Sequence, residues 1–207
     1  MKKTWREALA NRYFILALAS TCLATVILVI FMPYYFREII APRYGTQLND
    51  WLLNLLRPHD WSLPIFALNY ACVLLTMVTN YDDPLTISSG LATWTGVTWL
   101  RMLTLYLFAL EPPPGIIVLN DPFLSAIVYP RDFTKDLFFS GHISTMMAMT
   151  LIEPSRKLRW IKIAATILAA VFILIQHVHY SIDVIFAPLF TYLIYRLVIY
   201  FKKPLIN

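Results

Sequence analysis

The chain has 207 residues, of which 59% are hydrophobic and 14% are charged, and it carries a formal net charge of +5. Soluble globular domains usually contain about 25% charged residues, so this composition argues against a soluble protein and favours an integral membrane protein. No Gly/Ser-rich linker, internal repeat or low-complexity tract divides residues 1–207, which predicts a single domain. The basic residues cluster between apolar runs, which is typical of a topology signal rather than of nucleic-acid binding.

The pattern predicts an all-α bundle of six transmembrane helices. A basic segment, residues 1–12, precedes the first apolar run, which is long for a signal-peptide core and lacks a small-residue cleavage site, so we expect it to be retained. Residues 37–62 include an amphipathic stretch that is too short to span, and we expect them at the membrane interface. Three consecutive prolines after Glu111 exclude a helix there. The predicted spans cover residues 13–36, 63–80, 87–110, 138–152, 160–177 and 184–201.

The distribution of lysine and arginine predicts that both termini face the cytoplasm. Six spans place both termini on one side, and the side with more basic residues is usually cytoplasmic. With the N-terminus inside, the cytoplasmic side carries Lys2, Lys3, Arg6, Arg12, Arg156, Lys157, Arg159, Lys162, Lys202 and Lys203, and the opposite side carries Arg37, Arg43, Arg57, Arg131 and Lys135. The span ends that hold His142, His179 and Asp183 are then non-cytoplasmic.

His179 and Asp183 lie four residues apart near the start of the last predicted span. Residues at that spacing share one face of a helix, so the carboxylate can accept a hydrogen bond from one imidazole nitrogen and leave the other as a nucleophile. The alternative is a His–Asp pair that caps a helix junction at the membrane surface. The pair alone favours this structural alternative.

Ser140-Gly141-His142 stands at the start of the fourth predicted span. Ser and Gly at a helix start leave backbone N–H groups that suit a phosphate oxygen, and His142 could donate a proton to a leaving oxygen. The alternative is an ordinary helix cap followed by an incidental histidine. Because both histidine motifs fall within residues 137–183 and are expected on the same side, a shared active site is favoured.

Arg101 is the one charged residue inside the third predicted span. A charge within a span normally faces the bundle interior or a wet cavity, so Arg101 is a candidate phosphate ligand, with a structural ion pair as an equally weighted alternative. Arg131 or Lys135 in the loop before the fourth span could add positive charge. His177 is expected to be an interfacial polar residue, and the spacing of the histidines does not fit a zinc site, so we predict no metal.

Together, Ser140-Gly141-His142 and His179-x3-Asp183 resemble the motifs of the type 2 phosphatidic acid phosphatase superfamily, which comprises six-span enzymes that work through a phosphohistidine. More narrowly, Asp136-x3-Ser140-Gly141-His142 and His179-Tyr180-Ser181-Ile182-Asp183-Val184 resemble the sphingomyelin synthase branch, with Ile143 and Ser181 where that branch has threonine. Arg101-x2-Thr104, followed by Leu110-Glu111-Pro112, is similar to a degenerate form of the branch's third-helix motif. The similarity runs from about Arg101 to Arg196.

The resemblance implies His179 as the nucleophile, Asp183 as its orienting carboxylate, and His142 as general acid and then general base. It also implies a substrate-binding set, which comprises Ser140, Gly141, Arg101, Asp136 and Tyr180. No cofactor is expected. The chain departs from the broader phosphatase family, because the Lys-x6-Arg-Pro motif and the Ser-Arg pair before the nucleophilic histidine are both missing. A phosphomonoester dianion calls for several cations, so a single buried arginine suits a phosphodiester better.

The implied function is transfer of a phosphorylated headgroup from a phospholipid donor to a lipid hydroxyl, such as that of ceramide or diacylglycerol, as in sphingomyelin or ceramide-phosphoethanolamine synthesis. With water as the acceptor, the same site would act as a lipid phosphatase or a phospholipase C-type hydrolase. A third reading is a non-catalytic membrane protein that binds lipid headgroups. The chain shows no soluble extension before its spans, so we expect a bacterial inner-membrane protein with its site on the non-cytoplasmic face; a eukaryotic protein with a lumenal site would show the same pattern.

Overall fold

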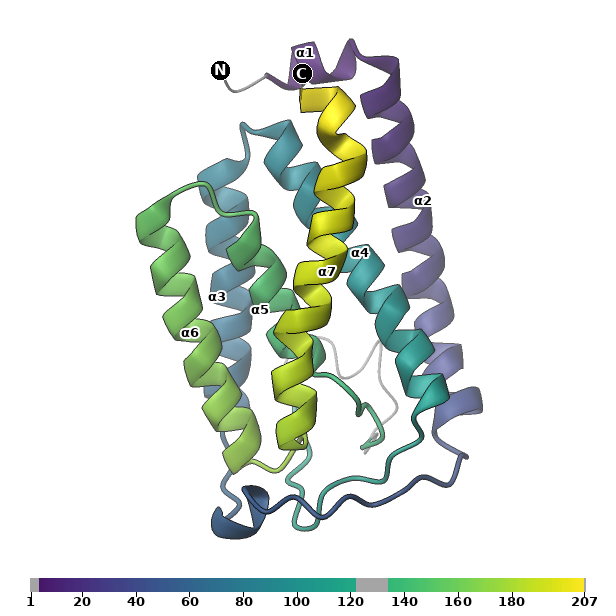
Figure 1. The fold of residues 1–207 in the computed structure, drawn as a ribbon, viewed down its shortest axis with the longest axis vertical. Helices are drawn as coiled ribbons and strands as arrows, with labels where there is room; N and C mark the ends of the chain where they lie inside the picture. Colours follow the sequence, from purple (N-terminus) through teal and green to yellow (C-terminus); the bar gives the residue numbers. More distant parts are fainter. Residues whose placement is uncertain (1–3, 122–133, 207) are drawn as a thin grey trace.

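The computed structural model describes residues 4–121 and 134–206, which contain seven α-helices and no β-strand. A π-helical segment, η1, continues the second helix, and a single 3₁₀ turn, η2, follows it. The helices form one bundle, and both termini lie at the same end of it (Figure 1). The elements are α1 (Trp5–Leu9), α2 (Arg12–Tyr34), η1 (Tyr35–Ile40), η2 (Leu53–Leu55), α3 (Ser62–Asn80), α4 (Pro84–Leu107), α5 (Gly141–Leu151), α6 (Arg156–Ile175) and α7 (Ser181–Ile206).

Four segments are long and apolar enough to cross a membrane: α2 together with η1, α3, α6 and α7. The prediction of a helical membrane protein is thus confirmed, whereas the number of six spans is not. α4 has 24 residues, and many of its buried residues are serine or threonine. α5 has only 11 residues, and at 1.5 Å per residue it is about 16 Å long, roughly half of the hydrocarbon thickness.

The helix starts differ from the predicted ones by one to four residues; α6 begins at Arg156 rather than at residue 160, and α7 begins at Ser181 rather than at residue 184. Two of the other differences have identifiable reasons. α4 begins at Pro84 rather than at residue 87, because the Asp83 side chain accepts the Thr86 N–H and proline fits the first helical position. The fourth predicted span, residues 138–152, was placed too early, since α5 begins only at Gly141. Phe138 and Phe139 have φ values of 62° and 56°, which a right-handed helix does not allow.

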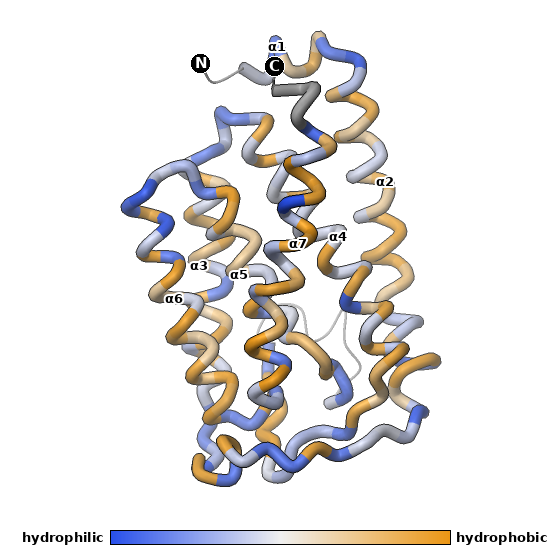
Figure 2. Tube along the Cα trace, viewed as in Figure 1, coloured by the Kyte–Doolittle hydropathy of each residue, from blue (hydrophilic) through white to orange (hydrophobic). Residues whose placement is uncertain are grey.

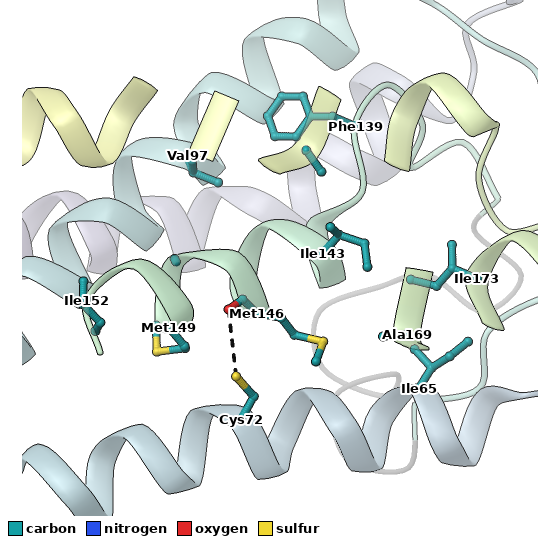
Figure 3. Close-up of a cluster of buried hydrophobic side chains, with 12 residues drawn as sticks. Ile65, Cys72, Val97, Phe139, Ile143, Met146, Met149, Ile152, Ala169 and Ile173 are labelled. Atoms are coloured by element: carbon teal, nitrogen blue, oxygen red, sulfur yellow. Dashed lines mark hydrogen bonds between the residues drawn. The ribbon is translucent and has the colours of Figure 1, made fainter. Parts of the chain in front are cut away.

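α5 lies at the centre of the bundle and packs against α3, α4, α6 and α7. Its buried side chains Ile143 and Met146 belong to one apolar cluster with Ile65 of α3 and Ile173 of α6 (Figure 3). In a lipid environment, close packing of this kind holds helices together, because the surrounding lipid tails are as apolar as the side chains. The cluster fixes the start of α5 relative to its neighbours.

Apolar residues, orange in Figure 2, make up much of the long helices, and many of their large side chains face outward. Ile30, Leu63, Ile167 and Ile185 are all more than half exposed. Such an outer face suits lipid, which cannot satisfy exposed polar groups.

A fully buried ion pair joins α6 to the end of α5. The Lys162 ammonium contacts the Glu153 carboxylate, and each side chain is 1% exposed. Lys162 Nζ also donates to Thr76 Oγ1 of α3 at 2.6 Å. Lys162 was counted above among the cytoplasmic basic residues, but its charge is neutralised inside the bundle and adds little to a topology signal.

Residues 41–61 run across the end of the bundle where α6 ends and α7 begins (Figure 1). Leu53 of η2 packs in a buried cluster with Leu137 and Tyr180, and the Trp61 ring stacks on Phe172 with centroids 4.4 Å apart. The amphipathic stretch that we expected at the membrane interface therefore packs against the two motif-bearing segments.

Candidate active site

His179 and Asp183 form a buried pair at the beginning of α7. His179 Nδ1 donates to Asp183 Oδ2 at 3.2 Å, and the same oxygen accepts the Tyr180 backbone N–H at 3.2 Å. The side chains of His179 and Asp183 are 3% and 0% exposed. Because Nδ1 is committed to the carboxylate, Nε2 is the nitrogen left for chemistry.

The contact between His179 and Asp183 was predicted correctly, but its helical basis was not. α7 begins at Ser181, so His179 precedes the helix instead of sharing a helical face with Asp183. The carboxylate reaches back from the first turn to the residues before it, as the acidic member of a capping box does. The pair therefore sits at a helix N-terminus, where a negative charge is favoured.

The turn before His179 has an unusual residue at its key position. α6 ends at Ile175, and His177 has a φ of 56°, a conformation that favours glycine. The N–H groups of His177 and Val178 bond to the Leu174 and Ile173 carbonyls, which is the hydrogen-bond pattern of a Schellman motif. His177 Nδ1 lies 2.8 Å from the Pro114 carbonyl, which it can reach as a donor. His177 thus terminates α6, and its side chain is buried in the turn before α7.

Ser140-Gly141-His142 occupies the predicted position at the start of α5. Ser140 is the N-cap residue, and its Oγ accepts the Ile143 N–H at 3.5 Å. Among the described residues, no acceptor contacts the backbone N–H groups of Gly141 and His142. Unsatisfied N–H groups at a helix N-terminus suit an anionic oxygen.

A backbone hydrogen bond joins the two histidine motifs. The Ser140 N–H donates to the Asp183 carbonyl oxygen at 3.1 Å, and α5 packs against α7. The start of α5 therefore lies directly against the first turn of α7. This contact between two segments that are 43 residues apart in the sequence is what the shared-site hypothesis requires.

Arg101 reaches the same place from α4. It is only 4% exposed, its Nε donates to the Phe139 carbonyl at 3.0 Å, and its guanidinium forms an ion pair with Asp136. A Cβ added at Gly141 would lie 2.9 Å from Arg101 Cζ, so the absence of a side chain at Gly141 makes room for the guanidinium. The two predicted roles of Arg101, a phosphate ligand and a structural ion pair, are both compatible with this position.

The strained turn before Ser140 is tied to Arg101. Phe138 and Phe139 are both in the left-handed region, which is rare for bulky residues and costs of order 1–3 kcal/mol for each. The Phe139 carbonyl that accepts from Arg101 belongs to this turn. Such strain persists only where the surroundings hold it, and it clusters at functional sites.

His142 is half-buried and lies close enough to His179, Asp136 and Arg101 to interact with them electrostatically. Its ring packs edge-on against Phe66 with centroids 5.2 Å apart. The Asn69 side chain donates to the His142 carbonyl at 3.2 Å, which anchors the first turn of α5 to α3.

Three polar residues near the site, Tyr70, Asp121 and Asp50, belong to no sequence motif, and the sequence analysis did not identify them. Asp121, which interacts electrostatically with His142, accepts from the Tyr70 hydroxyl at 2.9 Å. Asp50 accepts from the Ser181 N–H at the start of α7, at 2.6 Å. No local pattern links these side chains to the histidine motifs, because each reaches the site from a distant segment.

Tyr180 and Lys135, which the sequence analysis considered for the site, both form hydrogen bonds with other residues of the protein. The Tyr180 hydroxyl, on a fully buried side chain, donates to the Glu111 carbonyl at 2.9 Å and accepts the Leu48 N–H at 3.1 Å. Lys135 pairs with the Glu111 carboxylate at 2.9 Å, and this hydrogen bond lowers the pKa of Glu111. Arg131 lies outside the described residues.

Within residues 4–121 and 134–206, no group of three or more His, Cys, Asp or Glu side chains is placed to hold a metal ion.

Residues 135–201 match the family model described as the PAP2 superfamily C-terminal domain. This match supports the type 2 phosphatidic acid phosphatase superfamily. It spans about a third of the chain and contains Asp136, the Ser140–His142 motif and the His179–Asp183 pair. A comparison with curated proteins finds no match.

Proposed function

We propose that the protein is a membrane lipid phosphotransferase that moves a phosphorylated headgroup from a phospholipid to a second lipid's hydroxyl. The observation that carries this proposal is the hydrogen bond from Ser140 N–H to the Asp183 carbonyl, which holds the segments of the two histidine motifs against each other. The superfamily match adds independent support for phosphate chemistry on lipids.

In the first half-reaction, His179 Nε2 attacks the donor's phosphorus. A P–N bond forms, the P–O bond to diacylglycerol breaks, and His142 gives a proton to the departing oxygen. Asp183 keeps Nδ1 protonated and oriented, so the nucleophilic nitrogen is presented correctly and the positive charge that develops on the ring is stabilised.

In the second half-reaction, a lipid hydroxyl attacks the phosphorus of the phosphohistidine. His142 removes the hydroxyl proton, a P–O bond forms, and the P–N bond breaks to regenerate His179. Water in place of the lipid hydroxyl would complete the same cycle as hydrolysis, and the superfamily match, to a family of lipid phosphatases, favours that as the second candidate function.

The non-bridging phosphate oxygens are assigned to Arg101 and to the N–H groups of Gly141 and His142. Among the described residues, Arg101 is the cation that touches the Gly141 turn, and Lys135 is paired with Glu111. A phosphodiester carries one negative charge and needs fewer cations than a phosphomonoester dianion. The site therefore suits a phosphodiester donor, as in a synthase of the sphingomyelin type.

Six membrane segments with both termini in the cytoplasm fit this site best. Both termini lie at the end of the bundle opposite the start of α7 (Figure 1), as an even number of passes requires, and the basic residues favour the N-terminal side as cytoplasmic. The half-length α5 would be shielded from lipid by the four helices packed around it, whereas α4 also presents Leu103 and Leu107 outward. The site then faces the non-cytoplasmic leaflet.

The test uses purified protein in liposomes that contain a headgroup-labelled phospholipid, with and without ceramide or diacylglycerol. We expect a new labelled phospholipid that depends on the acceptor and is absent with His179→Ala. Release of labelled headgroup regardless of acceptor would establish the hydrolase. No product from any common donor would contradict both catalytic functions and favour a lipid-binding protein.

A further inference from the structure

A loop from a distant part of the chain is fixed against the residues that present His179. We call residues 45–53 the strap. The Thr46 N–H donates to the Ala109 carbonyl at 2.9 Å, and the Glu111 N–H donates back to the Thr46 carbonyl at 3.1 Å. The Gly45 N–H donates to the Glu111 carboxylate at 2.9 Å. The strap is therefore anchored to the segment that follows α4.

The strap supplies the cap of α7. An α-helix begins with N–H groups that lack intrahelical acceptors, and a side-chain oxygen at the N-cap position usually accepts one of them. The residue before α7 is Tyr180, whose hydroxyl points to other partners. Asp50 takes its place: one carboxylate oxygen accepts the Ser181 N–H at 2.6 Å, and both oxygens lie 2.8 Å from Ser181 Oγ.

Asp50 is itself held in position by the strap. Its Oδ1 accepts the Leu52 N–H at 3.1 Å and the Leu53 N–H at 3.4 Å. Leu53 packs in the buried cluster with Tyr180. The carboxylate is thus a fixed acceptor rather than a mobile surface charge, and a negative charge at this helix end is favoured by the helix dipole.

The residue next to the candidate nucleophile is clamped by the same strap. The Tyr180 hydroxyl accepts the Leu48 N–H and donates to the Glu111 carbonyl, while the Tyr180 N–H binds the Asp183 carboxylate. Tyr180 and Ser181 are therefore both tied to one loop. His179 stands immediately before them, so its ring position depends on where the strap holds this turn.

We propose that Asp50 is a positioning residue for catalysis, because it caps α7 from the strap and thereby fixes His179 against the start of α5. This inference rests on the proposed function, since it assumes that His179 reacts with phosphate. Asp50 acts through Ser181 and Tyr180 and is not expected to touch the substrate. A nucleophile displaced by about 1 Å can lose about a hundredfold in rate, so a loosened cap should lower turnover more than binding.

The test compares Asp50→Ala and Asp50→Asn with a matched control, Asp60→Ala. Asp60 is also a carboxylate at a helix start, where its Oδ1 accepts the Ser62 N–H of α3 at 2.9 Å. We expect Asp50→Ala to lower kcat by about ten- to a hundredfold with KM within about twofold. Asp50→Asn keeps one acceptor oxygen and should fall between wild type and Asp50→Ala. Asp60→Ala should retain kcat within about twofold.

Hydrogen exchange, measured on the same proteins, gives a readout that does not depend on turnover. Asp50→Ala should speed exchange across residues 179–185, whereas Asp60→Ala should leave that segment unchanged. Wild-type kcat in Asp50→Ala, or an equal loss of kcat in the two alanine variants at equal folded fraction, would overturn the inference. If Asp50→Ala does not fold, the same comparison is made with Asp50→Asn and Ser181→Ala, which removes only the hydroxyl contact. Activity retained by His179→Ala would instead contradict the proposed function. The experiment therefore distinguishes a failure of the role assigned to Asp50 from a failure of the proposed function.

Discussion

Gly141→Ala tests whether Arg101 must remain in its observed position. The new Cβ would lie 2.9 Å from Arg101 Cζ and Nη1, against about 3.4 Å for ordinary contact, so the guanidinium has to move by about 0.5 Å. It cannot move freely, because Nε donates to the Phe139 carbonyl and the group is paired with Asp136. A misplacement of about 1 Å can cost about a hundredfold in rate, so half of that predicts a roughly tenfold lower kcat. Stability should change little, since alanine is favoured over glycine in helices by up to about 1 kcal/mol, which offsets the strain.

The assay is headgroup transfer in liposomes, with kcat and KM determined separately, together with thermal unfolding in detergent. Gly96→Ala is the matched control, because its Cβ would lie 2.9 Å from Ile194 Cγ2, a contact of equal closeness between α4 and α7 that touches no site residue. We expect the control to keep its kcat. If Gly141→Ala has the wild-type kcat, turnover does not depend on the observed position of the Arg101 guanidinium, and the prediction is refuted.

Further outcomes are expected for three buried or capping groups. Asp183→Asn should fold normally but lower kcat by about 10³–10⁴-fold, as loss of the orienting carboxylate does in catalytic triads; a loss under tenfold in the transfer assay would contradict the assigned role. Lys162→Met should lower the free energy of unfolding, measured with denaturant, by about 3–5 kcal/mol, because it leaves Glu153 buried without its partner. The double variant Lys162→Met/Glu153→Gln should regain part of this free energy, and a double variant as unstable as Lys162→Met would refute the pairing argument. Burial opposes ionisation of Asp50, but the hydrogen bonds from Ser181, Leu53 and Leu52 together outweigh it and lower the pKa of Asp50 below 3.8. Because the folded-state pKa is depressed, this stabilisation is complete above about pH 4 and is lost as the pH falls through the folded value. Unfolding measured against pH should therefore show a weaker acid dependence in Asp50→Asn than in wild type, and identical curves would contradict the cap.

Local sequence patterns predicted the features that depend on neighbouring residues. Ser140 caps α5 as its position suggested, and the contact between His179 and Asp183 forms although His179 lies outside the helix. The apolar runs located the long helices because lipid demands an apolar outer face. Proline and aspartate also mark the start of α4 at residue 84, a signal that hydropathy alone overlooked.

Features that depend on distant segments could not be predicted from the sequence. The cap of α7 comes from Asp50, 131 residues before its partner. His177 occupies a left-handed position that normally indicates glycine. Lys162 reads as a topology charge in the sequence, yet it is paired inside the bundle. In each case contacts with distant parts of the chain determine the local structure, and the neighbouring sequence does not predict those contacts.

The most direct test of the central claim is to trap and locate the covalent intermediate. Purified protein is incubated with a phospholipid labelled at its phosphate in the absence of acceptor, quenched rapidly, and analysed by peptide mass spectrometry. We predict a phosphorylated headgroup attached to His179, lost in His179→Ala and discharged when a lipid hydroxyl is added. Full turnover with no adduct at His179, or an adduct that persists in His179→Ala, would contradict the proposed mechanism.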